Sequence, residues 1–270
     1  MRIDVAFGPS VPKDEFTGRP VFVVDVLRAT TTICAALDAG ARAVIPVAST
    51  DEALRMAQTL DSRDVLLAGE RNCEPIPGFA LGNSPREMTP EVVGGRTIVM
   101  TTTNGTRALV AAAAGNPVVV AAGVNLGAAA LRARQALADG GDLLILCAAR
   151  EQAFSLDDAY AAGRLILEAL EGRRFRKGLN DAALVAVDLA RRYGPRFDRP
   201  LSISAAGRQL RALGYGDDVA HAAIVDRHPV LPVFHDRRIT LVSPIPLTPP
   251  SAPSGPSGPS GPSAPTPPSA

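Results

Sequence analysis

Short apolar runs alternate along the chain with longer alanine-rich stretches. Runs of strand length occur at Val21–Val24, Val44–Val47, Val65–Ala68, Thr97–Met100, Val118–Ala122 and Leu143–Cys147. They are apolar at nearly every position rather than at every second one, which is typical of strands that are buried on both faces. The pattern therefore predicts an α/β fold with a largely parallel sheet covered by helices.

The alanine-rich stretches between these runs have the length of helices. We predict helices at Thr31–Ala39, Thr50–Leu60, Thr106–Ala114, Leu126–Asp139, Leu156–Glu171, Asp181–Tyr193 and Ala205–Leu213. Ser49 with Glu52, and Ser155 with Asp158, have the spacing of capping boxes at the start of two of them.

The sequence resembles itself at an offset of 76 residues. The segment "VVDVLRATTTICAALDAGARAVIPVA" falls over "VMTTTNGTRALVAAAAGNPVVVAAG", and a further strand in each copy ends at Arg71 or Arg150. This similarity predicts two related lobes, at about residues 1–95 and 96–244. Shared secondary structure explains it as well as a duplication does, so both explanations stay open.

The last part of the chain differs in composition from the rest. Residues 245–270 consist almost entirely of Pro, Ser, Gly, Ala and Thr, with few side chains that could offset the entropy cost of ordering. We predict a catalytic unit over residues 1–244 and a disordered tail. An inert tail and a partner-binding tail with polyproline II character both stay open.

Charge and cysteine content narrow the class of protein. The 28 basic and 27 acidic residues nearly cancel, so we expect neither nucleic acid nor a membrane as partner. The three cysteines have no CxxC spacing, and no run of about 18 apolar residues occurs. We therefore expect a cytoplasmic protein. A homo-oligomer is compatible with the sequence.

Two loops rich in hydroxyl groups follow predicted strands. "DVLRATTT" contains Asp25, Arg28 and Thr30, and "TTTNGTR" contains Thr101, Thr102, Thr103 and Asn104. Ligands of parallel sheets bind at the carboxyl ends of the strands, where helix N-termini favour anions. These loops therefore indicate an oxyanion site, although threonines at such positions also cap helices. Neither loop is a P-loop or a dinucleotide fingerprint.

A third loop, "GERNCEPIPGFALGNSPRE", begins at the end of another apolar strand. It contains Glu70, Arg71, Asn83 and Ser84, with glycines and prolines that specify its path. Glu70 is a candidate metal ligand or general base, with a plain surface acid as the alternative.

Other polar residues have weaker patterns. Arg150 follows a strand and suits a substrate acid group, a structural salt bridge being the alternative. We interpret Asp158 as a capping residue and Cys34 and Cys147 as core residues. We interpret the three histidines as structural.

At these residues the sequence resembles the 2-phosphosulfolactate phosphatase family. The matching segments are residues 23–37, 69–87 and 96–109, "CAAR" with "FSLDDAYAAG", and "DVAHAAIVDRHPVLP". The family usually has glycine where this chain has Cys73 and Ala149, and aspartate where it has Ala80.

The resemblance implies a three-layer α/β/α fold, Mg²⁺ as cofactor, and hydrolysis of the phosphate ester of a small 2-hydroxy acid. The substrate that names the family is the phosphorylated sulfolactate of coenzyme M biosynthesis. A non-catalytic binding protein for a small phosphorylated or sulfonated acid is the alternative. An isomerase or lyase would need a lysine or histidine in the site, and neither Lys13 nor Lys177 lies in the motif loops.

We assign roles to residues on this basis. Asp25 and Glu70 are the predicted metal ligands or water-activating base, and the catalytic set also contains Arg28, Thr30 and Asn104. The predicted substrate-binding residues are Arg71, Asn83, Ser84, Thr101, Thr102, Thr103 and Arg150. We expect direct attack by water, because motifs of aspartyl-phosphate and thiol phosphatases are missing, but Asp25 as a covalent nucleophile stays open.

Overall fold

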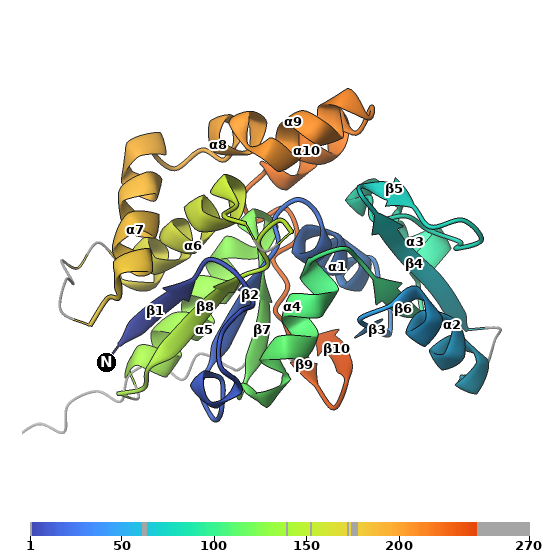
Figure 1. The fold of residues 1–270 in the computed structure, drawn as a ribbon, viewed down its shortest axis with the longest axis horizontal. Coiled ribbons are helices and arrows are strands. Elements are labelled where there is room, and N and C mark those ends of the chain that lie inside the picture. Colours follow the sequence, from blue (N-terminus) through green and yellow to red (C-terminus); the bar gives the residue numbers. More distant parts are fainter. Residues whose placement is uncertain are drawn as a thin grey trace, which may run out of the picture.

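One mixed sheet forms the centre of the molecule. The computed structural model describes residues 2–60, 64–138, 140–151, 153–171, 173 and 178–241. Within these residues, ten strands lie in the order β1-β8-β2-β7-β9-β10-β3-β6-β4-β5 (Figure 1). Their bounds are β1 Ile3–Ala6, β2 Val21–Val24, β3 Ala43–Pro46, β4 Val65–Arg71, β5 Glu74–Pro75, β6 Thr97–Thr101, β7 Val118–Ala121, β8 Leu143–Cys147, β9 Pro232–His235 and β10 Arg238–Leu241.

The sheet consists of two parallel groups joined by a hairpin. Strands β1, β8, β2 and β7 are parallel to one another, and so are β3, β6 and β4. The hairpin β9–β10 lies between the groups and pairs antiparallel with β7 on one side and β3 on the other. Residues close to the C-terminal end of the described chain therefore join the two groups.

The two groups have matching connectivity, which gives the internal sequence similarity a structural counterpart. Strand β2 lies between β8 and β7, and strand β6 lies between β4 and β3. Helix α1 leads from β2 to β3 in the other group, and α4 leads from β6 back to β7. Strands from before and after residue 95 thus alternate within each parallel group. Whether the two parts of the chain are separate folding units stays a prediction.

Helices cover both faces of the sheet, so the three-layer α/β/α prediction is confirmed (Figure 1). Val21 and Val23 pack against the α1 and α4 side, whereas Phe22 and Val24 pack against the α5, α6 and α7 side. The helices are α1 Ala29–Asp38, α2 Thr50–Thr59, α3 Pro90–Val93, α4 Gly105–Ala111, α5 Leu126–Ala138, α6 Leu156–Ala169, α7 Asp181–Tyr193, α8 Asp198–Ile203, α9 Ala205–Ala212 and α10 Gly216–Ala222.

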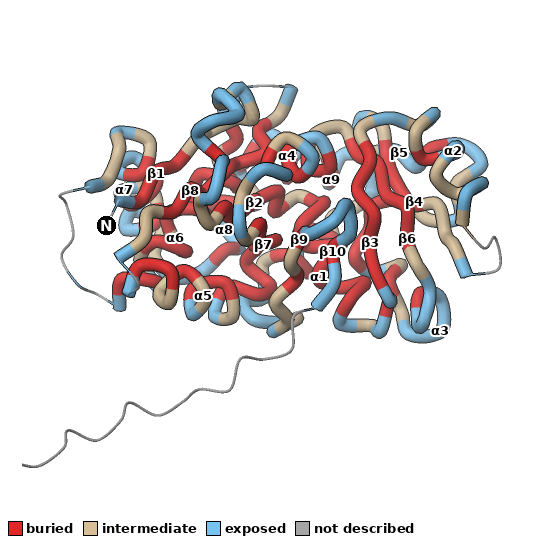
Figure 2. Tube along the Cα trace, turned by 90° about the horizontal axis from the view of Figure 1, so that it is seen from below, coloured by how far each residue is buried: buried red, intermediate tan, exposed pale blue. Residues whose placement is uncertain are grey.

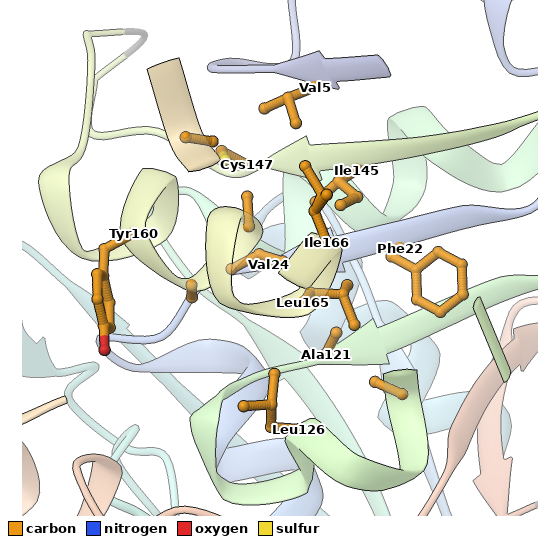
Figure 3. Packing of buried hydrophobic residues seen from close by; sticks show 14 of the residues in the cluster. Val5, Phe22, Val24, Ala121, Leu126, Ile145, Cys147, Tyr160, Leu165 and Ile166 are labelled. Atoms are coloured by element: carbon orange, nitrogen blue, oxygen red, sulfur yellow. The ribbon is translucent and has the colours of Figure 1, made fainter. Parts of the chain in front are cut away.

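The buried residues lie along the sheet in three hydrophobic clusters (Figure 2). On the α5 and α6 side, Val24 and Ile145 from the strands meet Leu165 and Ile166 of α6 (Figure 3). Helices α6 and α7 pack closely because Gly163 has no side chain: a Cβ there would lie 1.9 Å from the carbonyl oxygen of Ala186. Burial of this apolar surface provides the main stabilisation of the fold.

The structure contains every strand and helix that the hydrophobic pattern predicts. The Ser49 cap is confirmed, since the Ser49 hydroxyl accepts from the Glu52 N–H at 3.1 Å and Glu52 accepts from the Ala48 N–H. Elements that the pattern did not predict are β1, β5, β9, β10, α3, α8 and α10. The predicted disordered tail, residues 245–270, lies outside the described residues. No helix in the described ranges is long and apolar enough to cross a membrane.

Candidate active site

A polar cavity opens where the loops after β2, β4, β6 and β8 meet helix α9. Nearly all of its lining comes from the motif segments of the sequence. The lining residues are Asp25, Leu27, Arg28, Glu70, Asn72, Cys73, Asn83, Thr103, Asn104, Ala149, Arg150, Glu151, Ser155, Asp157, Asp158, Ala206 and Gln209.

The N-termini of α1 and α4 meet at this cavity. Gly105 lies so close to the first loop that a Cβ would be 2.4 Å from both Asp25 Oδ2 and Ala29 Cβ. The Thr30 hydroxyl donates to the Asp25 carbonyl at 2.7 Å, and it accepts from the Asp25 N–H. Thr30 therefore fixes the backbone from which the Asp25 carboxylate projects.

Three buried aspartates give the cavity an unusual electrostatic character. The pKa of Asp25 is raised to about 7, mainly by burial and also by the charges of Asp157 and Glu70, while a backbone hydrogen bond from Ala29 and the charge of Arg28 act in the opposite direction. Burial also raises the pKa of Asp157 and of Asp158, the latter well above its ordinary value. These carboxyl groups lie close enough to influence one another's protonation.

Asp158 does not cap α6, so the predicted capping box at Ser155 is wrong. The Asp158 carboxylate instead accepts from the Val26 N–H at 3.0 Å, which ties α6 to the loop after β2. The Ser155 hydroxyl donates to Asp157 Oδ1 at 2.5 Å. Both aspartates therefore belong to the cavity rather than to a helix cap.

Glu70 holds two of the motif loops together. Its carboxylate accepts from the N–H groups of Cys73 and Thr103, each at 2.7 Å, and from the Thr103 hydroxyl at 3.0 Å. A carboxylate with three such donors is strongly oriented. The metal role predicted for Glu70 stays a prediction, and in this arrangement it would compete with these hydrogen bonds.

Arg28 is the centre of a buried network that sequence reasoning missed. Its guanidinium donates to Asp218 Oδ2 and to the Cys73 carbonyl, both at 2.8 Å, and lies 4.5 Å from the centre of the Tyr215 ring. The other oxygen of Asp218 accepts from the Ser84 hydroxyl at 2.7 Å. Asp218 of α10 thus links two motif loops and positions Arg28 at the edge of the cavity.

The two arginines that match in the internal repeat have different surroundings. Arg71 donates to the Glu70 carbonyl and to the hydroxyls of Thr50 and Thr101, away from the cavity. Arg150 lines the cavity and donates to Gln209 Oε1 at 2.6 Å. The repeat therefore has one arginine on the scaffold and one in the site.

The structure brings seven of the predicted site residues to the cavity: Asp25, Arg28, Glu70, Asn83, Thr103, Asn104 and Arg150. The others do not line it, and their side chains contact protein groups: Thr30, Arg71, Ser84, Thr101 and Thr102. Direct contact of these residues with a substrate stays a prediction.

The polar residues Asp157, Asp158 and Gln209, which line the cavity, and Asp218, which positions Arg28, had no predicted role in the site. Asp157 and Asp158 lie in the "FSLDD" segment. The two adjacent acids could have indicated site residues, but Asp158 was interpreted as a helix cap. Gln209 belongs to a helix with no motif of its own. Asp218 begins the "DVAHAAIVDRHPVLP" segment, for which no site role was predicted, and only the fold brings both residues to the loops.

The groups in the cavity fit a hard divalent cation. Asn83 is buried, and its side-chain oxygen has no hydrogen-bond partner in the structure. Carboxylate and amide oxygens are the ligands that Mg²⁺ prefers, with one or two carboxylates and several waters. Among the described residues, no three His, Cys, Asp or Glu side chains form a ready metal-binding group. The donor types therefore suit Mg²⁺ with water and substrate as further ligands.

Comparison with known proteins agrees with the motifs. The profile of the 2-phosphosulpholactate phosphatase family matches residues 9–237. A protein of Symbiobacterium thermophilum named "Probable 2-phosphosulfolactate phosphatase" is 42% identical over 232 residues, which are 86% of this chain and 98% of that protein. A protein of the same name from Thermus thermophilus is 39% identical over 88% of this chain and 95% of its own.

A third protein of that name, from Deinococcus radiodurans, is 42% identical over 78% of this chain and 85% of its own length. The family name denotes phosphoric monoester hydrolases. Because the profile and these relatives cover most of the sequence, the chain belongs to the 2-phosphosulfolactate phosphatase family.

Proposed function

We propose that this protein is a Mg²⁺-dependent cytoplasmic phosphatase that hydrolyses the phosphate ester of a small 2-hydroxy acid. The name of its relatives points to 2-phosphosulfolactate, which would give sulfolactate and phosphate and place the reaction in coenzyme M biosynthesis. The observation that carries the proposal is the excess of buried carboxylates in the cavity.

Five acidic side chains line the cavity against two arginines, and the charge of Arg28 is already compensated by Asp218. A phosphorylated acid carries several negative charges and would be repelled by such a surface. A bound divalent cation would offset this negative charge, and Asp157, Asp158 and the Asn83 oxygen are the groups that would hold it. When bound, Mg²⁺ neutralises charge on the phosphoryl oxygens and on the leaving alkoxide.

Asp25 is the group best suited to activate water. With a pKa of about 7 it is a stronger base than an ordinary carboxylate, and near neutral pH it both accepts and returns a proton. In the proposed reaction Asp25 takes a proton from water, the water oxygen bonds to phosphorus and the ester P–O bond breaks. The proton then passes to the alkoxide, so that one water molecule is added across the ester.

The surrounding residues hold the phosphoryl group and the loops. Arg150 and Asn104 line the cavity with donor groups for phosphoryl or acid oxygens. Asn104 is placed by accepting from the Glu151 N–H at 3.2 Å, and Glu70 keeps the loops after β4 and β6 at fixed separation. Oriented donors of this kind stabilise the charge that develops during phosphoryl transfer.

The test is phosphate release from a panel of phosphorylated 2-hydroxy acids, with Mg²⁺ and with a chelator. We expect Mg²⁺-dependent release, and a loss of about 10²–10⁴-fold in kcat for Asp25→Asn, as for a removed general base. Asp188→Asn, at an exposed position of α7, is the matched control and should behave like the wild type. Binding of the acids without phosphate release would instead support the non-catalytic alternative.

A further inference from the structure

One face of α9 forms part of the wall of the cavity. Ala206 and Gln209, three residues apart on that helix, line the cavity beside Arg150. Helix α9 is well anchored, because the Ser204 hydroxyl accepts from the Gly207 N–H at 2.9 Å and Leu210 is fully buried. The position of the Gln209 side chain is therefore set by the core of the C-terminal helices.

Arg150 keeps its positive charge available in this arrangement. Within the described part of the chain it forms no ion pair, and its side-chain partner is the neutral amide oxygen of Gln209. The Arg150 side chain lines the same cavity as Asp157 and Asp158. A glutamate at position 209 would compensate this charge, whereas glutamine fixes the side chain without doing so.

The NH₂ group of the Gln209 side chain is a further hydrogen-bond donor at the cavity. Since its oxygen accepts from Arg150, its NH₂ group is directed elsewhere, and no described residue accepts a hydrogen bond from it. A guanidinium and an amide NH₂ side by side present several donors to one small anionic group. That is the donor set expected for a planar or tetrahedral acid group.

We propose that Arg150 and Gln209 form the subsite for the acid group of the substrate, with Gln209 as a specificity-determining residue. This inference rests on the proposed function, because it concerns the part of the substrate that is not hydrolysed. The ligand is a carboxylate or a sulfonate on the carbon chain of the phosphate ester. Arg150 supplies the charge, while Gln209 orients Arg150 and donates to an acid oxygen.

The experiment compares Gln209→Glu and Gln209→Met with the wild type on three esters with Mg²⁺ present. These are 2-phosphosulfolactate, 2-phospholactate, which lacks the sulfonate, and p-nitrophenyl phosphate, which lacks both acid groups. For Gln209→Glu we expect KM to rise about tenfold to a hundredfold for the esters whose acid group uses the subsite, as for loss of a charged hydrogen bond. The kcat for those esters, and both constants for p-nitrophenyl phosphate, should change little.

Gln135→Glu on α5 makes the same chemical change in a half-buried helical position away from the cavity and should leave all constants unchanged. If 2-phosphosulfolactate alone is affected, the subsite takes the sulfonate. If 2-phospholactate is affected as well, it takes the carboxylate. An equal loss on all three esters, or a change in kcat alone, would overturn the subsite and make Gln209 a support of the fold.

Calorimetric titration with sulfolactate separates this inference from the proposed function. Sulfolactate binding that is weakened in Gln209→Glu but not in Gln135→Glu would support the subsite even if no ester were hydrolysed. Equal sulfolactate binding by both variants and the wild type would overturn it even if hydrolysis were confirmed.

Discussion

At the scale of single residues, Cys73 and Ala149 stand out. They occupy the two positions where the resemblance described above leads us to expect glycine, and both adopt the left-handed backbone conformation, with φ of 72° and 64°. This conformation costs an L-residue roughly 1–2 kcal/mol, a cost that glycine does not have. Both residues line the cavity, so the chain carries backbone strain next to its candidate site.

Ala149→Gly should therefore raise the free energy of unfolding by about 1 kcal/mol, since the relief of strain exceeds the small loss of buried surface. Ala148→Gly is the control, because Ala148 is equally buried but is not among the residues with positive φ. It should lower stability by about 0.5–1 kcal/mol. Urea unfolding measures both, and a destabilised Ala149→Gly would contradict the strain argument.

The raised pKa of Asp25 predicts how the free energy of unfolding depends on pH. Its folded pKa of about 7 lies above the ordinary value of 3.8, so between about pH 4 and 7 the folded protein binds more protons than the unfolded chain. The contribution of Asp25 to the free energy of unfolding therefore falls as pH rises through this window. Burial lowers the pKa of His221 to about 4, which gives the opposite trend below about pH 6.5.

Comparison with Asp25→Asn isolates the Asp25 contribution. In a chelating buffer we expect this variant to gain stability over the wild type from pH 5 to pH 8, since it no longer buries an ionised carboxylate. Thermal unfolding at the two pH values measures the difference. A difference that stays constant with pH would show that Asp25 has an ordinary pKa.

The candidate site was predictable where its residues follow strands. Asp25, Glu70, Asn104 and Arg150 each lie at or just beyond the end of an apolar run, and the parallel strands of each group bring such ends together. Asp218 and Gln209 have no such signal, because they reach the site from helices far along the chain. The prediction for Asp158 was wrong although its spacing from Ser155 is that of a capping box. Its carboxylate instead accepts a hydrogen bond from the Val26 N–H in the loop after β2.

At the scale of elements, the pattern predicted the buried strands and missed the strands at the edges and in the hairpin. Strand β1 contains Asp4, whose carboxylate pairs with Arg19 at 2.8 Å, so its apolar run is interrupted. Strands β9 and β10 contain exposed polar residues, and their pairing with β7 and β3 spans more than 100 residues of sequence. Local periodicity does not reveal such distant partners.

A buried ion pair connects helix α10 to the site, and its contribution to stability can be tested. In Asp218→Asn the buried Arg28 guanidinium loses its carboxylate, and we expect a loss of about 3–5 kcal/mol in the free energy of unfolding. Asp217→Asn removes the neighbouring carboxylate, which pairs with Arg86 on the exposed surface, and should cost at most about 1 kcal/mol. Chemical denaturation measures both. Equal effects would show that the buried network is not important for stability.

At the scale of the whole molecule, the alternation of strands predicts whether two fragments of the chain, divided at residue 95, can fold separately. Residues 1–95 supply β1 and β2 to one group and β3 and β4 to the other, and residues 96–241 supply β7 and β8 to the first group and β6 to the second. Separately expressed, each fragment should be unfolded by circular dichroism and hydrogen exchange, and mixing should restore cooperative unfolding. Either fragment folding alone would support separate lobes.

The meeting of α1 and α4 has a consequence for ancestry. Ala29 and Gly105, which contact one another, are also equivalent under the 76-residue offset, so a pseudo-twofold axis passes between them. A half-length polypeptide with this connectivity could complete the sheet only by exchanging strands with a second copy. In such a homodimer both loops at the axis would be identical. In this chain the loop after β2 contains Asp25, whereas the matching loop after β6 contains threonines. The two loops can differ in this way because both halves belong to one polypeptide, in which a mutation changes one loop without changing the other.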